Sequence, residues 1–230
     1  MKVLDLFSGI GGFSLGLERA GMETVAFCEI EPFCQKVLHK HWPDVPIYDD
    51  IKELTNDGLK ADGITDIDLI CGGYPCQPFS TAAAGKNPPD LLSGEMLRLV
   101  GEIRPGYVIA ENTEKKAFSE AFIYQLRKLG YEIIPKCIGA HEIGADHERS
   151  RWWLCAYTHH KGELSFTIDA EMARMSKVCA SVWSADSYSR AVRVPNGVSR
   201  KMDRNRLKAL GNAVVPQIPE LIGRAIMEAA

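Results

Sequence analysis

The chain has 230 residues, a net charge of −3 at pH 7 and 46% apolar residues, the balance of a globular protein of about one domain. No apolar run approaches the ~20 residues needed to cross a bilayer, and the N-terminus reads as a buried strand rather than a signal peptide. We therefore expect a cytoplasmic protein without contact to a membrane. Seven cysteines without a CxxC pair argue against both a disulfide framework and a metal site.

Strand-like and helix-like segments alternate along the first two thirds of the chain. The expected strands are 2–7, 24–29, 68–71, 107–111, 131–137 and 152–157. One expected helix ends near Gly21, and the others are 32–41, 93–103, 118–129 and 215–227. This alternation predicts an α/β fold, a doubly wound Rossmann-like sheet that binds ligands at the carboxyl ends of its strands.

After Tyr157 the periodic pattern gives way to a polar stretch that extends to about Asp203. Between Thr158 and Leu210 there are ten Lys and Arg residues against five Asp and Glu, a local charge of +5, so the remainder carries −8. This asymmetry indicates a basic face on an acidic body, which suits a nucleic-acid partner. A solvated basic surface would have the same composition.

The glycine-rich turn Asp5–Gly12 (DLFSGIGG) follows the first strand and opens a helix. Glycines there let the backbone turn tightly and approach a ligand, and the helix N-terminus favours polar groups. Glu29 ends the second strand, where a carboxylate can hold ribose hydroxyls. A dinucleotide site, or a plain tight turn and strand end, would have the same pattern.

The segment Gly72–Ser80 (GGYPCQPFS) carries the most specific signal. It follows a strand, so Cys76 stands at the ligand-binding edge of the sheet, and a proline on either side stiffens the loop. A buried cysteine in a loop is the alternative. With its Pro-Cys-Gln core, this segment resembles the nucleophile motif of the cytosine-C5 DNA methyltransferase family.

Other motifs resemble the same family in its order. Ala110–Thr113 resembles the Glu-Asn-Val motif with Thr113 in place of valine. Gly144–Arg151 resembles the Gln-x-Arg-x-Arg motif, with His147 in place of glutamine. Residues 209–216 resemble the C-terminal motif that completes the cofactor site. The resemblance implies a cofactor, S-adenosylmethionine, converted to S-adenosylhomocysteine and bound by Phe7, Ser8, Gly9, Ile10, Gly11, Gly12, Glu29, Ile30, Asp50, Ile51, Pro75, Asn212 and Ala213.

The resemblance also implies four catalytic residues. The thiolate of Cys76 attacks cytosine C6, and Glu111 supplies a proton to N3. A cysteine with a pKa of ~8.5 is only about 10% thiolate at pH 7.5, and a positive neighbour such as Arg149 or Arg151 would raise that fraction. Arg151 is also expected to hold the cytosine O2. Within the cofactor site, Glu29 is expected to bind the ribose and Asp50 the adenine amino group.

The expected organisation has three parts. Residues 1–157 form the catalytic and cofactor-binding domain, 158–203 a short target-recognition segment, and 204–230 a C-terminal segment that returns to the catalytic domain. The expected partner is double-stranded DNA with its target base flipped out, bound by a monomer. The segment Thr81–Leu92 is shorter than the family's mobile loop and lacks its arginine. This departure indicates either a compact phage or prophage type or a chain from which segments of the family are missing.

Three other functions are weighed against DNA methylation. A methyltransferase of the same chemistry could act on cytosine in tRNA. An inactive DNA-binding or cofactor-sensing protein would not require Cys76, Glu111 and Arg151 together. A nicotinamide dehydrogenase on a similar sheet does not explain the Pro-Cys-Gln motif or the late Gly-Asn motif.

Overall fold

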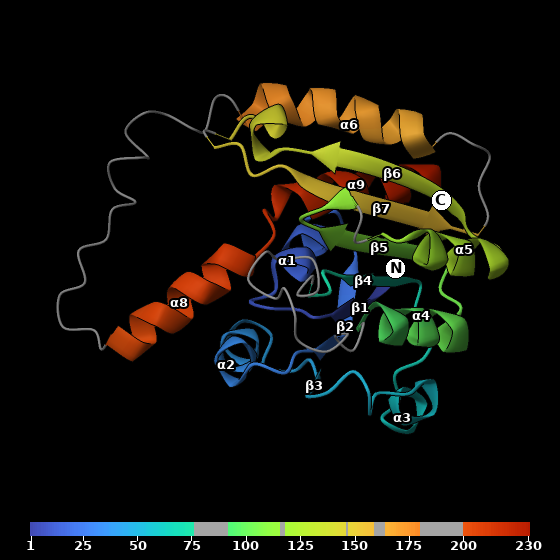
Figure 1. Ribbon diagram of the computed structural model, residues 1–230, viewed down its shortest axis with the longest axis vertical. Coiled ribbons are helices and arrows are strands. Elements are labelled where there is room, and N and C mark those ends of the chain that lie inside the picture. The colour runs from blue at the N-terminus through green and yellow to red at the C-terminus, as the bar shows by residue number, and fades with distance from the viewer. Residues whose placement is uncertain (76–91, 116–117, 146, 159–163, 180–199) are drawn as a thin grey trace, which may run out of the picture.

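A seven-stranded sheet forms the centre of the protein in the computed structural model, which describes residues 1–75, 92–115, 118–145, 147–158, 164–179 and 200–230. The spatial order of the strands is β3-β2-β1-β4-β5-β7-β6 (Figure 1). The strands are β1 Lys2–Leu6, β2 Glu23–Cys28, β3 Ile47–Tyr48, β4 Leu69–Gly72, β5 Tyr107–Asn112, β6 Glu132–Ile138 and β7 Arg151–Tyr157. The first five are parallel, whereas β7 is antiparallel to both of its neighbours.

Helices cover both faces of the sheet, as the alternating pattern predicts. They are α1 Gly12–Arg19, α2 Pro32–His41, α3 Asn56–Ala61, α4 Leu92–Ile103, α5 Glu120–Lys128, the short 3-10 helix η4 Ala140–Ile143, α6 Leu164–Cys179, α8 Arg200–Asn212 and α9 Gln217–Ala229. One core cluster joins the sheet to α1, α6 and α9, and a second joins it to α3, α4 and α5. The predicted doubly wound fold is therefore confirmed.

Burial on both faces explains why the central strands consist mostly of consecutive apolar residues. Adjacent residues of a strand point to opposite faces. Val3 accordingly lies in the cluster with α1 and α9, whereas Leu4 lies in the cluster with α4 and α5. Both side chains are fully buried.

The expectation of a polar, irregular stretch from 158 to 203 is wrong for part of this range. Residues 164–179 form α6, which packs against α9, and α8 begins at Arg200. Leu164, Ile168 and Met175 are buried in the core cluster shared with α9. These residues are four and seven positions apart, which is a helical spacing. The polar residues between them give the segment a low apolar content, so the sequence did not indicate a buried helix there.

The topology brings several chain segments to one edge of the sheet. The carboxyl ends of the parallel strands meet there, and the antiparallel β7 begins at the same edge. Trp152 is consequently paired with Asn112, and Trp153 with Glu111. In the part of the chain that the structure describes, no helix is both long and apolar enough for a transmembrane span.

Candidate active site

The glycine-rich loop between β1 and α1 is a tight turn in which several residues adopt the left-handed region. Phe7, Gly9 and Gly11 have φ angles of 53°, 55° and 83°. A side chain on Gly11 would collide with the Trp42 ring, with its Cβ 2.5 Å from the nearest ring carbon. At Gly9, by contrast, an added Cβ would have no heavy atom within 4 Å. The loop is thus packed on one side and open at Gly9.

Glu29, expected to bind a ribose, lies directly against this loop. Its carboxylate is nearly buried, and its oxygens accept hydrogen bonds from the backbone N–H of Gly9 at 2.6 Å and of Glu31 at 2.7 Å. A carboxylate has about four acceptor positions, so two remain for hydroxyl donors. The next residue, Ile30, is 66% exposed and offers an apolar surface beside the carboxylate.

Asp50 and Ile51 begin a turn after β3, the strand that pairs with β2. The backbone N–H of Glu29 donates to the Tyr48 carbonyl at 2.9 Å, which places this turn beside Glu29. The Asp50 side chain accepts a bond from the Lys52 N–H at 3.0 Å, and Ile51 is buried. The structure thus brings the expected ribose and adenine contacts to adjacent strand ends.

The C-terminal segment closes on the same loop. A Cβ on Gly12 would lie 2.9 Å from a methyl carbon of Val214, so the residue after Ala213 touches the start of α1. Asn212 ends α8 and is exposed. An open glycine loop, a carboxylate with remaining acceptor positions and an apolar neighbour form a donor and acceptor set that fits S-adenosylmethionine.

Glu111 lies at the carboxyl end of β5 and is paired with a residue of β7. Its Oε1 is 3.2 Å from Nε of Arg151, and its side chain is 11% exposed. Its Oε2 lies 2.9 Å from the position of a Cβ on Gly73, so a larger residue at position 73 would displace the carboxylate from this place. Burial raises the pKa of Glu111 to about 7, although the charges of Arg151 and Arg149 lower it.

Asn112 fixes the start of the loop that leads to Cys76. Its Nδ2 donates to the Tyr74 carbonyl at 3.1 Å, and the Tyr74 ring packs on Phe118 and Phe122. Pro75 follows and is exposed. Cys76 itself lies outside the described residues. Sequence reasoning used Glu111 from the Glu-Asn motif but assigned no role to Asn112, whose place in that motif was the available signal.

Arg149 faces the C-terminal segment. Its Nη2 donates to the carbonyl of Gly211 at 2.8 Å and also to the carbonyl of Ala213. A second link between distant segments joins α8 to the start of α2, where Lys208 Nζ lies 2.6 Å from Glu31 Oε1. Neither link was expected from the sequence, because both join residues more than 60 positions apart.

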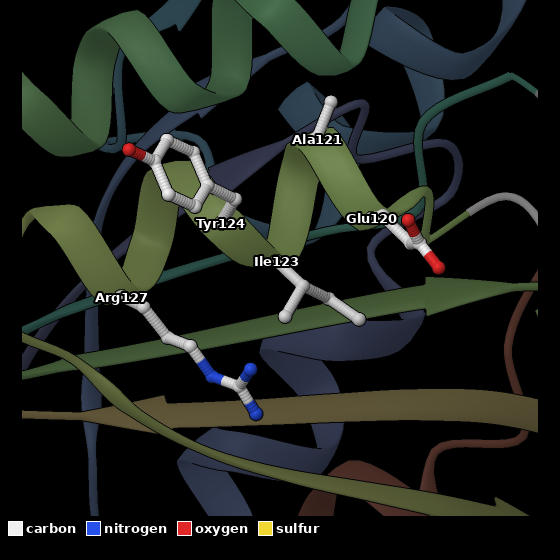
Figure 2. Close-up of a pocket in the computed structure, with 5 residues that line it drawn as sticks. All are labelled: Glu120, Ala121, Ile123, Tyr124 and Arg127. Carbon is white, nitrogen blue, oxygen red and sulfur yellow. The ribbon is translucent and has the colours of Figure 1, made fainter.

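A surface depression of about 630 Å³ lies elsewhere on the protein. All five residues that line it come from α5, as Figure 2 shows: Glu120, Ala121, Ile123, Tyr124 and Arg127. It shares no residue with the site at the sheet edge.

Comparison with known proteins gives consistent matches. The family model described as C-5 cytosine-specific DNA methylase matches residues 1–194. The type II methyltransferase M2.BsuMI of Bacillus subtilis is 34% identical over 169 residues, covering 68% of this chain and 42% of the relative. The type II methyltransferase M.FnuDI of Fusobacterium nucleatum is 35% identical over 161 residues, covering 66% and 45%.

A solved structure supports the same fold. A protein encoded within an E. coli prophage, assigned as a DNA modification methyltransferase, has a TM-score of 0.58 and 29% identity. The match covers 69% of this chain and 47% of that protein. The chain therefore spans less than half the length of these relatives.

Proposed function

The chain belongs to the C-5 cytosine-specific DNA methylase family, and we propose that it transfers a methyl group from S-adenosylmethionine to carbon 5 of a flipped cytosine in double-stranded DNA. The observation that carries this proposal is the buried Glu111, paired with Arg151 and lying against Gly73, three residues before Cys76. Glu111 would be the proton donor and Arg151 the cation, and both lie beside the backbone segment that leads to the nucleophile. The names of the relatives, both type II methyltransferases, support the same reaction.

The cofactor is assigned to the glycine loop and the neighbouring strand ends. Glu29 would accept bonds from the ribose hydroxyls, Asp50 from the adenine amino group, and Ile30 would cover an apolar face. The remaining members of this proposed site are Phe7, Ser8, Gly9, Ile10, Gly11, Gly12, Ile51, Pro75, Asn212 and Ala213. When bound, S-adenosylmethionine supplies an electrophilic methyl carbon.

Glu111 and Cys76 activate the cytosine ring. The thiolate sulfur of Cys76 forms a bond to C6, the C5–C6 double bond is lost, and N3 takes a proton from Glu111. Carbon 5 then has the electron density to accept a methyl group. Afterwards the C5 proton leaves to a base, the sulfur–C6 bond breaks, and N3 returns its proton to Glu111.

The elevated pKa of Glu111 suits this role. A glutamate with an ordinary pKa is about a thousandfold deprotonated at pH 7.5, so supplying its proton would cost about 4 kcal/mol. A pKa of about 7 removes most of that cost. Arg151 would hold the cytosine O2 while paired with Glu111, and the positive charge of Arg149 and Arg151 would favour the Cys76 thiolate.

DNA is assigned to the basic C-terminal third. The proposed organisation keeps residues 1–157 as the catalytic and cofactor-binding domain, 158–203 for target recognition and 204–230 as the returning segment. Because α6 packs on α9, we assign recognition mainly to residues 180–203 of that segment, which contain four Lys and Arg against two Asp and Glu and are followed directly by Arg204 and Arg206. We propose that the protein acts as a monomer in the cytoplasm.

Transfer of a labelled methyl group tests the proposal directly. The purified chain is incubated with labelled S-adenosylmethionine and either double-stranded DNA or tRNA. Label in DNA at 5-methylcytosine is the expected result, and label in tRNA alone would replace the DNA assignment with the RNA one. Cofactor binding without label in either substrate would indicate a protein that binds but does not catalyse.

A further inference from the structure

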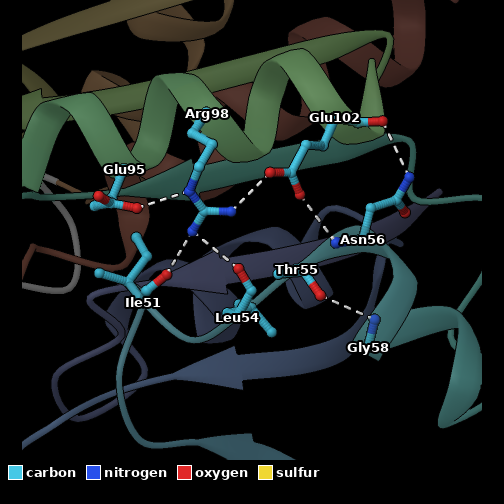
Figure 3. Close-up of polar contacts among 8 residues, drawn as sticks. All are labelled: Ile51, Leu54, Thr55, Asn56, Gly58, Glu95, Arg98 and Glu102. Atoms are coloured by element: carbon cyan, nitrogen blue, oxygen red, sulfur yellow. Dashed lines mark hydrogen bonds and ion pairs between the residues drawn. The ribbon is translucent and has the colours of Figure 1, made fainter.

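Arg98 on α4 makes four polar contacts with two parts of the chain. Its Nε donates to Glu95 Oε2 at 2.7 Å and its Nη1 to Glu102 Oε1 at 2.8 Å, both on its own helix. Its Nη2 donates to the carbonyls of Ile51 at 2.8 Å and Leu54 at 2.9 Å. Figure 3 shows the guanidinium lying between the helix and the turn, with Nε and Nη1 directed at the two carboxylates of the helix and Nη2 at the two carbonyls of the turn.

The turn that Arg98 contacts contains the proposed adenine contact. The Asp50 carbonyl accepts bonds from the N–H groups of Glu53 and Leu54, and its side chain accepts one from Lys52. The turn therefore sets where the Asp50 carboxylate points. Arg98 holds the carbonyl of the very next residue, Ile51, and also the far end of the turn.

Further contacts strengthen this connection. Glu102, itself paired with Arg98, accepts a bond from the N–H of Asn56 at 3.1 Å, and the Asn56 side chain donates to the Glu102 carbonyl at 3.0 Å. Ile51 and Leu54 are buried in the same core cluster as Met96 and Leu99 of α4. The turn is thus joined to α4 through main-chain carbonyls and side-chain packing together.

We propose that Arg98 is a positioning residue for the adenine end of the cofactor. It would hold the Asp50–Leu54 turn so that the Asp50 carboxylate meets the adenine amino group without reorganisation upon binding. Only a planar guanidinium can donate to two carboxylates and two carbonyls in this fork arrangement. The inference rests on the proposed function, because it requires S-adenosylmethionine to bind with its adenine at Asp50.

Calorimetric binding of S-adenosylhomocysteine to the full chain tests the proposal. Arg98→Met is expected to weaken binding about tenfold, the effect of losing charged hydrogen bonds that order the site. A lysine side chain can donate to fewer acceptors than arginine, so the affinity of Arg98→Lys is expected to lie between those of the wild type and Arg98→Met. If Arg98→Met does not fold, Arg98→Lys provides the answer, and wild-type affinity in that variant would overturn the proposal.

Two control variants separate positioning from general destabilisation. Glu95→Gln weakens an ion pair of Arg98 but leaves both carbonyl contacts in place. Arg224→Met removes a comparable helical ion pair, between Arg224 and Glu220 on α9. Both controls are expected to bind the ligand with wild-type affinity, and a loss in Arg224→Met equal to that in Arg98→Met would contradict the proposal.

A ligand without the adenine amino group sharpens the test. S-inosylhomocysteine lacks the group that Asp50 would recognise, so its affinity is expected to fall much less in Arg98→Met than that of S-adenosylhomocysteine. Equal losses for both ligands would mark Arg98 as only structural. Failure of the wild-type chain to bind S-adenosylhomocysteine would instead overturn the proposed function, so the two failures are distinguishable.

Discussion

Nε of Arg151 lies 3.2 Å from Oε1 of Glu111, which pairs a cation from the antiparallel strand β7 with a carboxyl group at the end of β5. The two residues are 40 positions apart in the chain and meet because their strands are neighbours. The pairing limits how far burial can raise the pKa of Glu111, and that pKa settles at about 7. The proposed proton donor is thus titratable near neutral pH.

Glu111→Gln is expected to slow methyl transfer much more than it weakens DNA binding, because an amide cannot donate the proton to N3 in the transition state. Above about pH 7 the protonated fraction of Glu111 falls, whereas the thiolate fraction of Cys76 rises in both proteins. The ratio of the wild-type to the variant single-turnover rate is therefore expected to fall as the pH rises above about 7. Single-turnover kinetics from pH 6 to 9, with DNA binding measured in parallel, check both points. Equal losses of binding and turnover would mark Glu111 as a residue that only positions the base.

Cys76→Ser is expected to abolish methylation while leaving cofactor binding intact. A serine hydroxyl has a far higher pKa than a thiol, so it cannot form the C6 adduct at a useful rate. DNA that carries 5-fluorocytosine should trap a covalent complex with the wild type, because fluorine at C5 cannot leave as a proton does. Mass spectrometry locates the adduct, and Cys137→Ser, at the exposed cysteine of β6, serves as the control. An adduct on another cysteine would remove Cys76 from its role.

Glu29→Ala is expected to weaken S-adenosylmethionine binding by one to two orders of magnitude. The change removes the proposed ribose acceptor and leaves the N–H groups of Gly9 and Glu31 without the carboxylate that accepts from them. Calorimetry on the variant gives the affinity. Glu23→Ala, at the opposite end of β2, is the matched control and should bind normally. Unchanged affinity in Glu29→Ala would exclude Glu29 from the site.

Asp5 gives the protein a pH-dependent stability of predictable sign. It is fully buried, and its Oδ2 accepts a bond from the Ser14 hydroxyl at 2.7 Å. Burial raises its pKa from 3.8 to about 7, although Ser14 lowers it. The folded state therefore binds more protons than the unfolded chain between these values, so stability falls as the pH rises through this window.

Asp5→Asn is expected to lack this part of the pH dependence. Relative to the wild type, the variant should gain roughly 3 kcal/mol in free energy of unfolding between pH 5 and pH 8. Urea unfolding of the wild type and the variant at both pH values gives this difference in free energy of unfolding. Glu111 is present in both proteins, so its contribution to the pH dependence cancels in the comparison. A difference independent of pH would show that Asp5 keeps an ordinary pKa in the folded state.

Local patterns in the sequence were sufficient for most of the fold. The expected strand at 107–111 differs from β5 by one residue, and Pro32 begins α2 as predicted. These features depend on the spacing of apolar residues and on backbone restrictions of single residues, so they are readable within a short window. The helix α6 was not predicted, because its buried residues Leu164, Ile168 and Met175 and the partly buried Met172 stand among polar residues.

The candidate residues were also identifiable from the sequence, as strand ends and motifs, but their contacts were not. The meeting of Arg151 with Glu111, the bonds from Arg149 to Gly211 and Ala213, and the bonds from Arg98 to Ile51 and Leu54 join distant segments. Each depends on which strands pair, in which direction, and on which helix lies above them. Such contacts form only when the whole sheet has assembled. The pairing and register of the strands decide which side chains become neighbours, and the local sequence around each residue does not contain that information.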